Sequence, residues 1–341
     1  MPTKSSSKSL EAPKNGKEPA SHSISAVIPC HRETDHILGV ISGIGSEVSR
    51  IFVIDDACPD QTGAFVRDNC TDGRVEVIVQ SRNTGVGGAT VAGYRAALAA
   101  GANIIVKLDG DGQMDPALIP KLVEPLVAGR ADYTKGNRFG RTESLGGMPM
   151  TRVVGNITLS LASKFSSGYW NIFDPTNGFT ALHAKSARRL PLDQLANGYF
   201  FESDMLYRLG MMRAVVEDVP IQARYGKEVS GIQLHKVVPE FAVRHALNAC
   251  RRIGCTYLLR EVNAATLQLF LGVILLAIGI VFGISEWRVS AASGVPATAG
   301  TVILAALPII IGSQMLISFL NFDTGNVPKT PLQASDGEKT E

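Results

Sequence analysis

Asn103-Ile104-Ile105-Val106-Lys107-Leu108-Asp109-Gly110-Asp111-Gly112-Gln113-Met114-Asp115-Pro116 is the most informative stretch of this sequence. It begins with a short, β-branched run, which predicts a buried strand. Asp109 and Asp111 come next, and the glycine between them lets the backbone bend so that the carboxylates converge. Converging carboxylates are typical of a divalent cation site, where Mg²⁺ keeps positions open for phosphate oxygens. An ordinary polar turn fits the same residues, so the neighbouring sequence must distinguish the two.

Strand-like and helix-like runs alternate around this stretch. Strands are predicted at residues 25–29, 50–56, 75–79, 103–106 and 219–221, and helices at 36–43 and 89–100. The alternation indicates right-handed crossovers and a mostly parallel sheet covered on both faces. Ligands of such sheets bind beyond the carboxyl ends of the strands. Because Asp55-Asp56, Arg82-Asn83-Thr84-Gly85 and Asp109-Gly110-Asp111 all follow strands, we expect one shared site at that edge.

The glycine-rich run Gly85-Val86-Gly87-Gly88 matches no phosphate-binding fingerprint. It lacks the third spaced glycine of a dinucleotide site and the Gly-Lys-Ser/Thr of a P-loop. We expect a flexible turn at a helix N-terminus, where backbone amides could meet an anion or a ribose.

Size and charge allow one large α/β domain with an appendage. The 341 residues carry a formal net charge of +2, so no global field favours nucleic acid as a partner. Five cysteines are scattered without a CxxC pair, which favours reduced thiols in a cytosolic compartment. Residues 1–23 are rich in Ser, Lys, Pro and Glu, and we expect a disordered tail there, not a signal peptide.

Two apolar segments near the C-terminus are long enough to cross a bilayer, which takes about 20 residues in a helix. Residues 264–283 contain no charged side chain. In residues 299–320, Pro308 and Gln314 are the residues least suited to a transmembrane helix, although such helices tolerate both. We expect two transmembrane helices, and a very hydrophobic buried hairpin is the alternative.

The flanking charges predict the orientation of these segments. Four arginines precede the first one: Arg244, Arg251, Arg252 and Arg260. The connecting loop offers only Arg288 against Glu286. The positive-inside bias therefore places the N-terminal domain in the cytosol of a bacterial inner membrane or its equivalent.

Residues 240–260 predict an amphipathic helix before the first segment. Apolar side chains recur among its basic residues, namely Phe241, Leu247, Ile253, Tyr257 and Leu258. Such a helix could lie on an anionic membrane face or pack on the N-terminal domain, and the sequence leaves both open.

Six short motifs together resemble a known enzyme family. They are Val27-Ile28-Pro29-Cys30-His31-Arg32-Glu33, Val53-Ile54-Asp55-Asp56, Arg82-Asn83-Thr84-Gly85, Asp109-Gly110-Asp111-Gly112-Gln113, Gly136-Asn137-Arg138 and Asp174-Pro175-Thr176-Asn177-Gly178-Phe179. The set resembles the family-2 inverting glycosyltransferases, and within them the membrane-anchored polyprenyl-phosphate sugar synthases of the dolichyl-phosphate mannose synthase type. The resemblance covers about residues 24–235. It implies an α/β catalytic domain of the GT-A fold, with a Rossmann-like, mostly parallel sheet, followed by a two-helix transmembrane hairpin.

The resemblance also implies a site for a nucleotide-sugar donor, GDP- or UDP-linked. Mg²⁺ or Mn²⁺ would be held against the donor diphosphate by Asp109, Asp111 and Gln113, as a Lewis acid for the leaving group. The donor itself would contact Pro29, His31, Glu33, Asp55, Asn83, Gly85, Asp109, Gln113, Lys227 and Ser230. For the last two residues, a surface loop is an equally good interpretation.

The acceptor side follows from the same resemblance. A lipid phosphate would face Arg138, with help from Arg152, because arginine binds phosphate oxygens bidentately. Asn156 and Asp174 would also belong to the acceptor site, although Asp174 could equally fix a turn. Glu202 and Asp204 lie where many family members place a catalytic base. A phosphate acceptor needs no base, so these two could instead position the acceptor or hold Arg138.

The sequence departs from the family pattern in several places. Arg32 replaces the asparagine of the first motif, and His31 stands where an aromatic residue is common. Asn156 replaces a serine of the related synthases. The family's Arg-x-x-Gly-x-Ser-Lys appears here as Arg224-Tyr225-Gly226-Lys227-Glu228-Val229-Ser230-Gly231.

We therefore expect a metal-dependent, inverting transfer of one sugar from a nucleotide-sugar to polyprenyl phosphate, undecaprenyl or dolichyl, at the cytosolic membrane face. One alternative makes the acceptor a sugar hydroxyl of a growing glycan, with Glu202 or Asp204 as base. Another is a non-catalytic protein that binds nucleotide or recruits a flippase. Self-association and a flippase partner are further expectations.

The expected organisation of the chain has six parts. They are a disordered tail at 1–23, the GT-A domain at 24–235, an amphipathic juxtamembrane helix at 236–260, transmembrane helices at 264–283 and 299–320, and a flexible cytosolic tail at 321–341.

Overall fold

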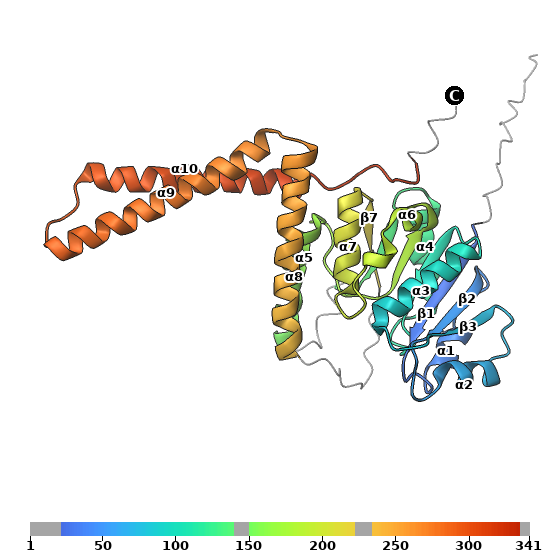
Figure 1. Cartoon of the computed structure of the whole chain (residues 1–341). Coiled ribbons are helices and arrows are strands. Elements are labelled where there is room, and N and C mark those ends of the chain that lie inside the picture. Colours follow the sequence, from blue (N-terminus) through green and yellow to red (C-terminus); the bar gives the residue numbers. More distant parts are fainter. Residues whose placement is uncertain (1–21, 140–149, 222–233, 335–341) are drawn as a thin grey trace, which may run out of the picture.

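The computed structural model describes residues 22–139, 150–221 and 234–334. Figure 1 shows a layered α/β domain from which a hairpin of two long helices projects. The strands are β1 (Ile24–Cys30), β2 (Val48–Asp55), β3 (Val75–Val79), β4 (Ile104–Lys107), β5 (Tyr133–Asn137), β6 (Thr180–His183) and β7 (Val216–Pro220). The α-helices are α1 (Ile37–Ser42), α2 (Thr62–Asn69), α3 (Gly85–Ala99), α4 (Ile119–Val127), α5 (Met150–Ser167), α6 (Ala184–Arg189), α7 (Phe201–Met212), α8 (Leu234–Gly254), α9 (Ala264–Ser293) and α10 (Ala299–Gly325). The 3₁₀ turns η1 (Pro116–Leu118) and η3 (Leu192–Gln194) and the π-helical segment η4 (Cys255–Arg260) complete the described elements.

The strands form one seven-stranded sheet in the order β3-β2-β1-β4-β6-β5-β7. Neighbouring strands are parallel except that β6 runs antiparallel to both β4 and β5. The predicted mostly parallel sheet is therefore confirmed. Since β5 has the same direction as β4, their carboxyl ends lie at one edge with those of β1 and β2. The segment that leads into β6 reaches that same edge, because Thr180 pairs with Lys107 of β4 and Lys135 of β5.

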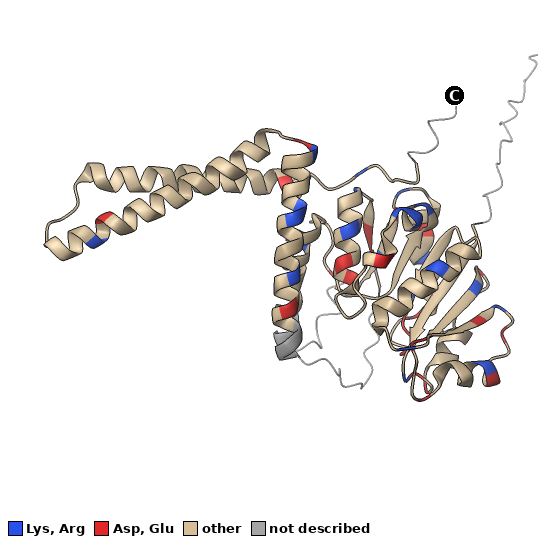
Figure 2. Cartoon of the chain, viewed as in Figure 1, with Lys and Arg blue, Asp and Glu red and all other residues tan. Residues whose placement is uncertain are grey.

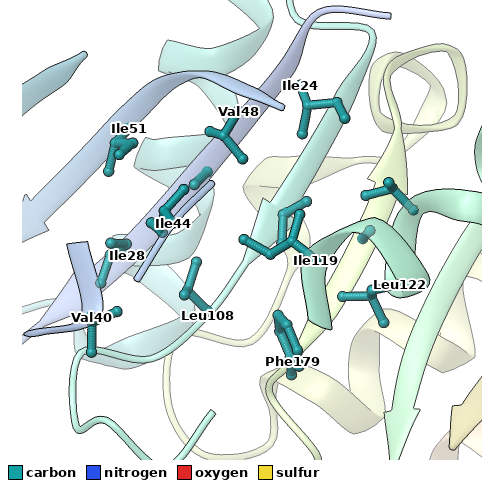
Figure 3. Packing of buried hydrophobic residues seen from close by; sticks show 14 of the residues in the cluster. Ile24, Ile28, Val40, Ile44, Val48, Ile51, Leu108, Ile119, Leu122 and Phe179 are labelled. Carbon is teal, nitrogen blue, oxygen red and sulfur yellow. The ribbon is translucent and has the colours of Figure 1, made fainter. Parts of the chain in front are cut away.

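Two apolar layers hold helices on the two faces of the sheet. Figure 3 shows one layer, in which Ile28, Val48 and Ile51 of the strands meet Val40 of α1 and Leu122 of α4. On the other face the strands pack against α3, α6 and α7. Burial of such side chains supplies about 25 cal/mol per Å² of apolar surface. The sheet is thus rigid beneath the edge where the motifs lie.

The C-terminal helices α9 and α10 are 30 and 27 residues long, with mean hydropathies of 2.7 and 2.2 over their most apolar windows. Both are long and apolar enough to cross a membrane, and their surfaces carry almost no charge in Figure 2. The helices extend beyond the predicted 264–283 and 299–320. They pack closely, since a Cβ on Gly312 would lie 2.8 Å from the carbonyl oxygen of Gly272.

Helix α8 packs against α5 and α7, as one of the two interpretations of residues 240–260 predicts. His245 of α8 lies 2.8 Å from the Ser166 hydroxyl, and its ring contacts Phe200 edge-on. The opposite side exposes Val243 and Leu247, so the helix is amphipathic in place. It begins at Leu234, two residues before the predicted start.

The expected flexible tail from residue 321 differs from the structure. Helix α10 continues to Gly325, and the following segment lies on the α/β domain up to residue 334. The backbone amides of Leu332 and Gln333 donate to the Asp132 carboxylate at 2.8 and 3.1 Å. Arg213 Nη1 donates to the Asn326 carbonyl at 3.0 Å. The described part of the tail is therefore bound to the domain.

Candidate active site

The carboxyl edge of the sheet gathers the predicted motifs. Asp56 and Arg138 directly follow β2 and β5, Asp109 comes one residue after β4, and the loop from residue 174 to 179 enters β6 at the same edge. The parallel directions of β2, β4 and β5 produce this convergence; the sequence predicted it for the motifs after β2 and β4, while β5 was not predicted.

Asp109, Asp111 and Gln113 occupy one turn after β4. The turn is closed by the Gln113 amide, which donates to Asp111 Oδ1 at 2.9 Å. Gly112 has φ +74°, a value that favours glycine. Two carboxylates and one side-chain amide are hard oxygen donors, and Mg²⁺ or Mn²⁺ bound to them would keep positions for diphosphate oxygens and water. The donor set therefore fits such a cation, although the described residues contain no cluster of three or more His, Cys, Asp or Glu side chains.

Lys107 lies beneath this turn and ties it to α7. Its Nζ lies 2.7 Å from Asp109 Oδ1, 3.2 Å from Glu202 Oε1 and 3.4 Å from the Gly178 carbonyl oxygen. The lysine is 1% exposed. Burial alone lowers the pKa of Lys107, but the charges of Asp109 and Glu202 outweigh it and raise the pKa above the usual range. A permanent cation thus fixes one oxygen of a predicted metal ligand.

Arg138 is held by Asp174. Nε donates to Oδ2 at 2.8 Å and Nη2 donates to Oδ1 at 2.9 Å, which is the bidentate geometry of a strong ion pair. The Asp174 side chain is fully buried, whereas Arg138 is 34% exposed. Asp174, and neither Glu202 nor Asp204, is therefore the carboxylate that holds Arg138. The pair presents the guanidinium at the edge of the site.

Asp55 and Asp56 shape the other half of the edge. Asp55 accepts from the amides of Cys58 and Gly63 at 2.7 and 2.6 Å, so it orders the loop before α2. Asp56 accepts from the amides of Thr84 and Gly85 at 2.8 and 2.7 Å, so it anchors the loop before α3. The sequence assigns no separate role to Asp56, although two aspartates at a strand end are the available signal.

The glycine-rich run differs from the expected flexible turn, because α3 already begins at Gly85. The amides of Gly87 and Gly88 donate to the Asn197 carbonyl at 2.7 and 3.2 Å. A Cβ on Gly87 would lie 2.1 Å from the Ala196 carbonyl oxygen. These amides therefore hold the loop before α7 instead of facing an anion, and glycine is required for that close approach.

A pocket of about 250 Å³ opens beside Asp55, with Ala57, Cys58 and Gln61 among its lining residues. Arg32, Ala57 and Gln61, at φ +65°, +50° and +50°, are three of the four non-glycine residues with positive φ in the described part of the chain. Such conformations concentrate at functional sites. Another pocket, of about 330 Å³, opens at the opposite end of β1, beside Ile24, and lies away from the motifs.

The remaining predicted donor residues surround this region. Pro29 lies in β1, and the Glu33 amide lies 3.3 Å from the Thr62 hydroxyl. His31 Nδ1 lies 3.4 Å from Asn83 Nδ2, so the loops after β1 and β3 meet. Lys227 and Ser230 lie outside the described residues.

Glu202 and Asp204 have different surroundings. Glu202 faces the site through Lys107, as described above. Asp204 Oδ2 accepts from the Ala196 amide and from Arg208 Nε, both at 3.0 Å. Asp204 therefore anchors the loop before α7 and is not brought to Asp109 or Arg138.

Two buried ionisable groups lie beside the loops around residues 137 and 173–177, and no sequence pattern selects them. Lys135 of β5 donates to the Asn177 carbonyl, and burial lowers its pKa to about 8. Asp218 of β7 accepts from Asn137 Nδ2 and the Phe173 amide at 2.9 and 3.0 Å. Burial raises the pKa of Asp218 to about 6. Both groups support the loops that carry Arg138 and Asp174.

Arg152 and Asn156 lie in the first turns of α5, and of these two side chains only Asn156 is described. Its Nδ2 is buried without a hydrogen-bond partner. The exposed side of the helix carries four apolar residues, Val154, Ile157, Leu161 and Phe165. No function for this apolar stripe follows from the sequence alone, although the helical spacing of its residues is visible there.

A GT-A-like sheet with two aspartates and a pocket at its carboxyl edge is the arrangement of a nucleotide-sugar transferase. The family model described as glycosyl transferase family 2 matches residues 25–190. An undecaprenyl-phosphate mannosyltransferase of Micrococcus luteus is 30% identical over 199 residues, which are 57% of this chain and 81% of the relative. The chain belongs to glycosyl transferase family 2 and is a glycosyltransferase.

Two further relatives and a solved structure agree with this assignment. A UDP-N-acetylglucosamine–dolichyl-phosphate N-acetylglucosaminyltransferase of Methanococcus voltae is 29% identical, over 58% of this chain and 84% of its own. A polyprenol monophosphomannose synthase of Mycolicibacterium smegmatis is 27% identical, over 67% and 89%. Glucosyl-3-phosphoglycerate synthase of Mycobacterium tuberculosis, solved with Mn²⁺ and UDP, has a TM-score of 0.51 at 22% identity, covering 68% of this chain and 81% of its own. This last likeness concerns the fold.

Proposed function

We propose that the protein transfers one sugar from a GDP- or UDP-sugar to a polyprenyl phosphate at the cytosolic membrane face, with a divalent cation and inversion at the anomeric carbon. The observation that carries the proposal is the placement of Arg138 at the same sheet edge as Asp109 and Asp111. The guanidinium group of Arg138, which can bind phosphate, thus lies beside a site suited to a diphosphate donor. The names of the relatives, which include polyprenyl-phosphate transferases, support the same acceptor class.

The donor would lie between the pocket beside Asp55 and the turn after β4. Asp109, Asp111 and Gln113 would hold Mg²⁺ or Mn²⁺, which would stabilise the negative charge of the leaving diphosphate. Lys107 keeps Asp109 in place without competing for the donor, because its ammonium group is buried. Prior placement of these groups avoids the cost of ordering them during the reaction.

The acceptor phosphate would be bound by Arg138, which Asp174 orients. The Arg138 side chain is 34% exposed, so a phosphate could approach it from the solvent side. A phosphomonoester with a second pKa of about 6 is mostly dianionic at pH 7 and can attack directly. Inversion then follows from one displacement, with the acceptor opposite the leaving diphosphate.

A sugar-hydroxyl acceptor is the second candidate, and it requires a base. Glu202 is already engaged with the buried Lys107, whose Nζ lies 3.2 Å from its Oε1. Asp204 is engaged with Arg208. These contacts favour the phosphate acceptor.

The membrane arrangement is part of the proposal. Helix α8 runs crosswise to the hairpin in Figure 1, so a membrane-spanning hairpin would leave α8 along the bilayer surface. The exposed apolar stripe of α5 and the exposed Val243 and Leu247 of α8 suit that surface. The cytosolic side rests on the arginines before α9, and Arg252 no longer supports it, because it pairs with Asp323 in a buried position. Self-association and a flippase partner stay predictions.

The test is a donor and acceptor screen with the purified full chain. Nucleotide-sugars are offered with undecaprenyl or dolichyl phosphate, or with a glycan hydroxyl acceptor, with and without Mg²⁺ or Mn²⁺. We expect cation-dependent transfer to the lipid phosphate, and the double variant Asp109→Asn/Asp111→Asn should abolish it. Wild-type rates in that variant, or transfer to the glycan alone, would contradict the proposal.

A further inference from the structure

The last turn of α10 carries a buried aspartate that joins three other parts of the chain. Asp323 Oδ1 accepts from Arg252 Nη1 at 2.7 Å and from the Tyr257 hydroxyl at 2.6 Å. Asp323 Oδ2 accepts from Arg252 Nη2 and Trp170 Nε1, each at 2.9 Å. The side chains of Arg252 and Asp323 are 7% and 3% exposed. We refer to these four residues as the Asp323 cluster.

Arg252 extends the cluster to α5. Its Nε donates to the Phe165 carbonyl at 3.0 Å. The guanidinium also lies against Gly168, where φ is +82° and an added Cβ would be 3.1 Å from Nη1. All three guanidinium nitrogens therefore have fixed acceptors, and the arginine clamps the end of α10 to the C-terminal end of α5.

Anchoring the hairpin to the domain does not require a buried charge. An aspartate in the last turn of a helix meets the negative end of the helix dipole, which is unfavourable. A well-packed apolar pair often stabilises a fold as much as a buried ion pair does. The hairpin is also closed independently, by the contact between Gly272 and Gly312. The distinctive contribution of the cluster is its directional geometry.

We propose that the Asp323 cluster is a positioning device for the acceptor, which fixes the membrane hairpin to α5 and so sets where a lipid-borne phosphate meets Arg138. The inference rests on the proposed transfer to a lipid phosphate. Helix α5 has 18 residues, and Asn156 lies nine residues before Phe165 on it, so the helix forms a rigid spacer of about 14 Å between the cluster and Asn156. A phosphate on a long, membrane-embedded polyprenyl chain reaches Arg138 only if the hairpin is held in this position relative to the domain. A phosphate on a short, freely diffusing chain does not depend on that position.

The test compares the two kinds of acceptor in one protein. The full-length chain is reconstituted in vesicles that contain undecaprenyl phosphate, or assayed in detergent with a soluble ten-carbon prenyl phosphate. For Asp323→Asn and Arg252→Lys we expect kcat/KM to fall about tenfold with the embedded acceptor, within the range found for coupled sites. The same variants should keep the wild-type kcat/KM with the short acceptor and the wild-type KM for the donor. Glu240→Gln is the control, because it removes an exposed ion pair of the same helix.

A spectroscopic readout reports on the cluster without activity. The chain has two tryptophans, so Trp287→Phe leaves Trp170 as the single emitter. Asp323→Asn should shift its emission, since the indole N–H faces a changed acceptor. An unchanged emission, equal losses with both acceptors, or no loss with the embedded acceptor would each overturn the inference. Wild-type protein inactive with either lipid would instead overturn the proposed function, and the inference with it.

Discussion

Gly178→Ala tests whether the contact between the loop at residues 174–179 and the turn at residues 109–113 controls catalysis. A Cβ at this position would lie 2.6 Å from Asp109 Oδ2, 2.7 Å from Lys107 Nζ and 3.1 Å from Met114 Cε. The shortest of these is about 0.8 Å below the separation at which ordinary contact begins. Because the same Cβ would also crowd the Lys107 ammonium group that holds Asp109, the carboxylate must leave its position.

The expected effect is large on rate and moderate on stability. A displacement of about 1 Å in a catalytic group lowers rates by about 100-fold. Adding a methyl group to a closely packed site costs about 1–3 kcal/mol of unfolding free energy. We therefore expect Gly178→Ala to fold, with kcat about 100-fold lower and a higher Mn²⁺ concentration for half-maximal rate.

The assay is sugar transfer at saturating donor over a Mn²⁺ titration, with thermal unfolding in detergent as the folding check. Gly198→Ala is the matched control, because a Cβ there meets nothing within 4 Å. Wild-type kcat and Mn²⁺ dependence in folded Gly178→Ala would refute the reasoning, because Asp109 could then move without consequence.

Two further predictions concern stability. The folded-state pKa of Asp218 is about 6 against a usual 3.8, so its stabilising contribution is complete below pH 3.8 and lost as the pH rises through about 6. Asp218→Asn should therefore raise the Tm in detergent at pH 7.5 and change it little at pH 4, and an equal shift at both pH values would contradict this. Gly312→Ala should lower hairpin stability by about 1–3 kcal/mol, because its Cβ would meet backbone atoms of Gly272 and Leu276 at 2.8 Å. Gly283→Ala is the control, with an ordinary 3.4 Å contact, and equal stability of the two variants by detergent unfolding would count against the tight crossing.

Local pattern predicted five of the seven strands and missed β5 and β6. Residues 75–79 form a strand with the predicted bounds, and β1, β2 and β4 differ from their predicted ranges by one or two residues. The largest error in a helix start is at α3, which includes the glycine run. In its first turn, the amides of Gly87 and Gly88 donate to the Asn197 carbonyl, which lies more than a hundred residues further along the sequence. No local pattern could reveal that contact.

The sequence by itself indicated five of the seven strands, the edge at which the motifs after β2, β3 and β4 meet, and the two apolar helices, because hydrophobic periodicity is a local property. Only the tertiary structure decided which charges are partners. Lys107 meets Glu202, Arg138 meets Asp174 and Arg252 meets Asp323 across long stretches of chain. Those pairs depend on the antiparallel insertion of β6 and on how α8 and α10 cross. The charged residues were therefore visible in the sequence, while their roles depend on where the fold places them.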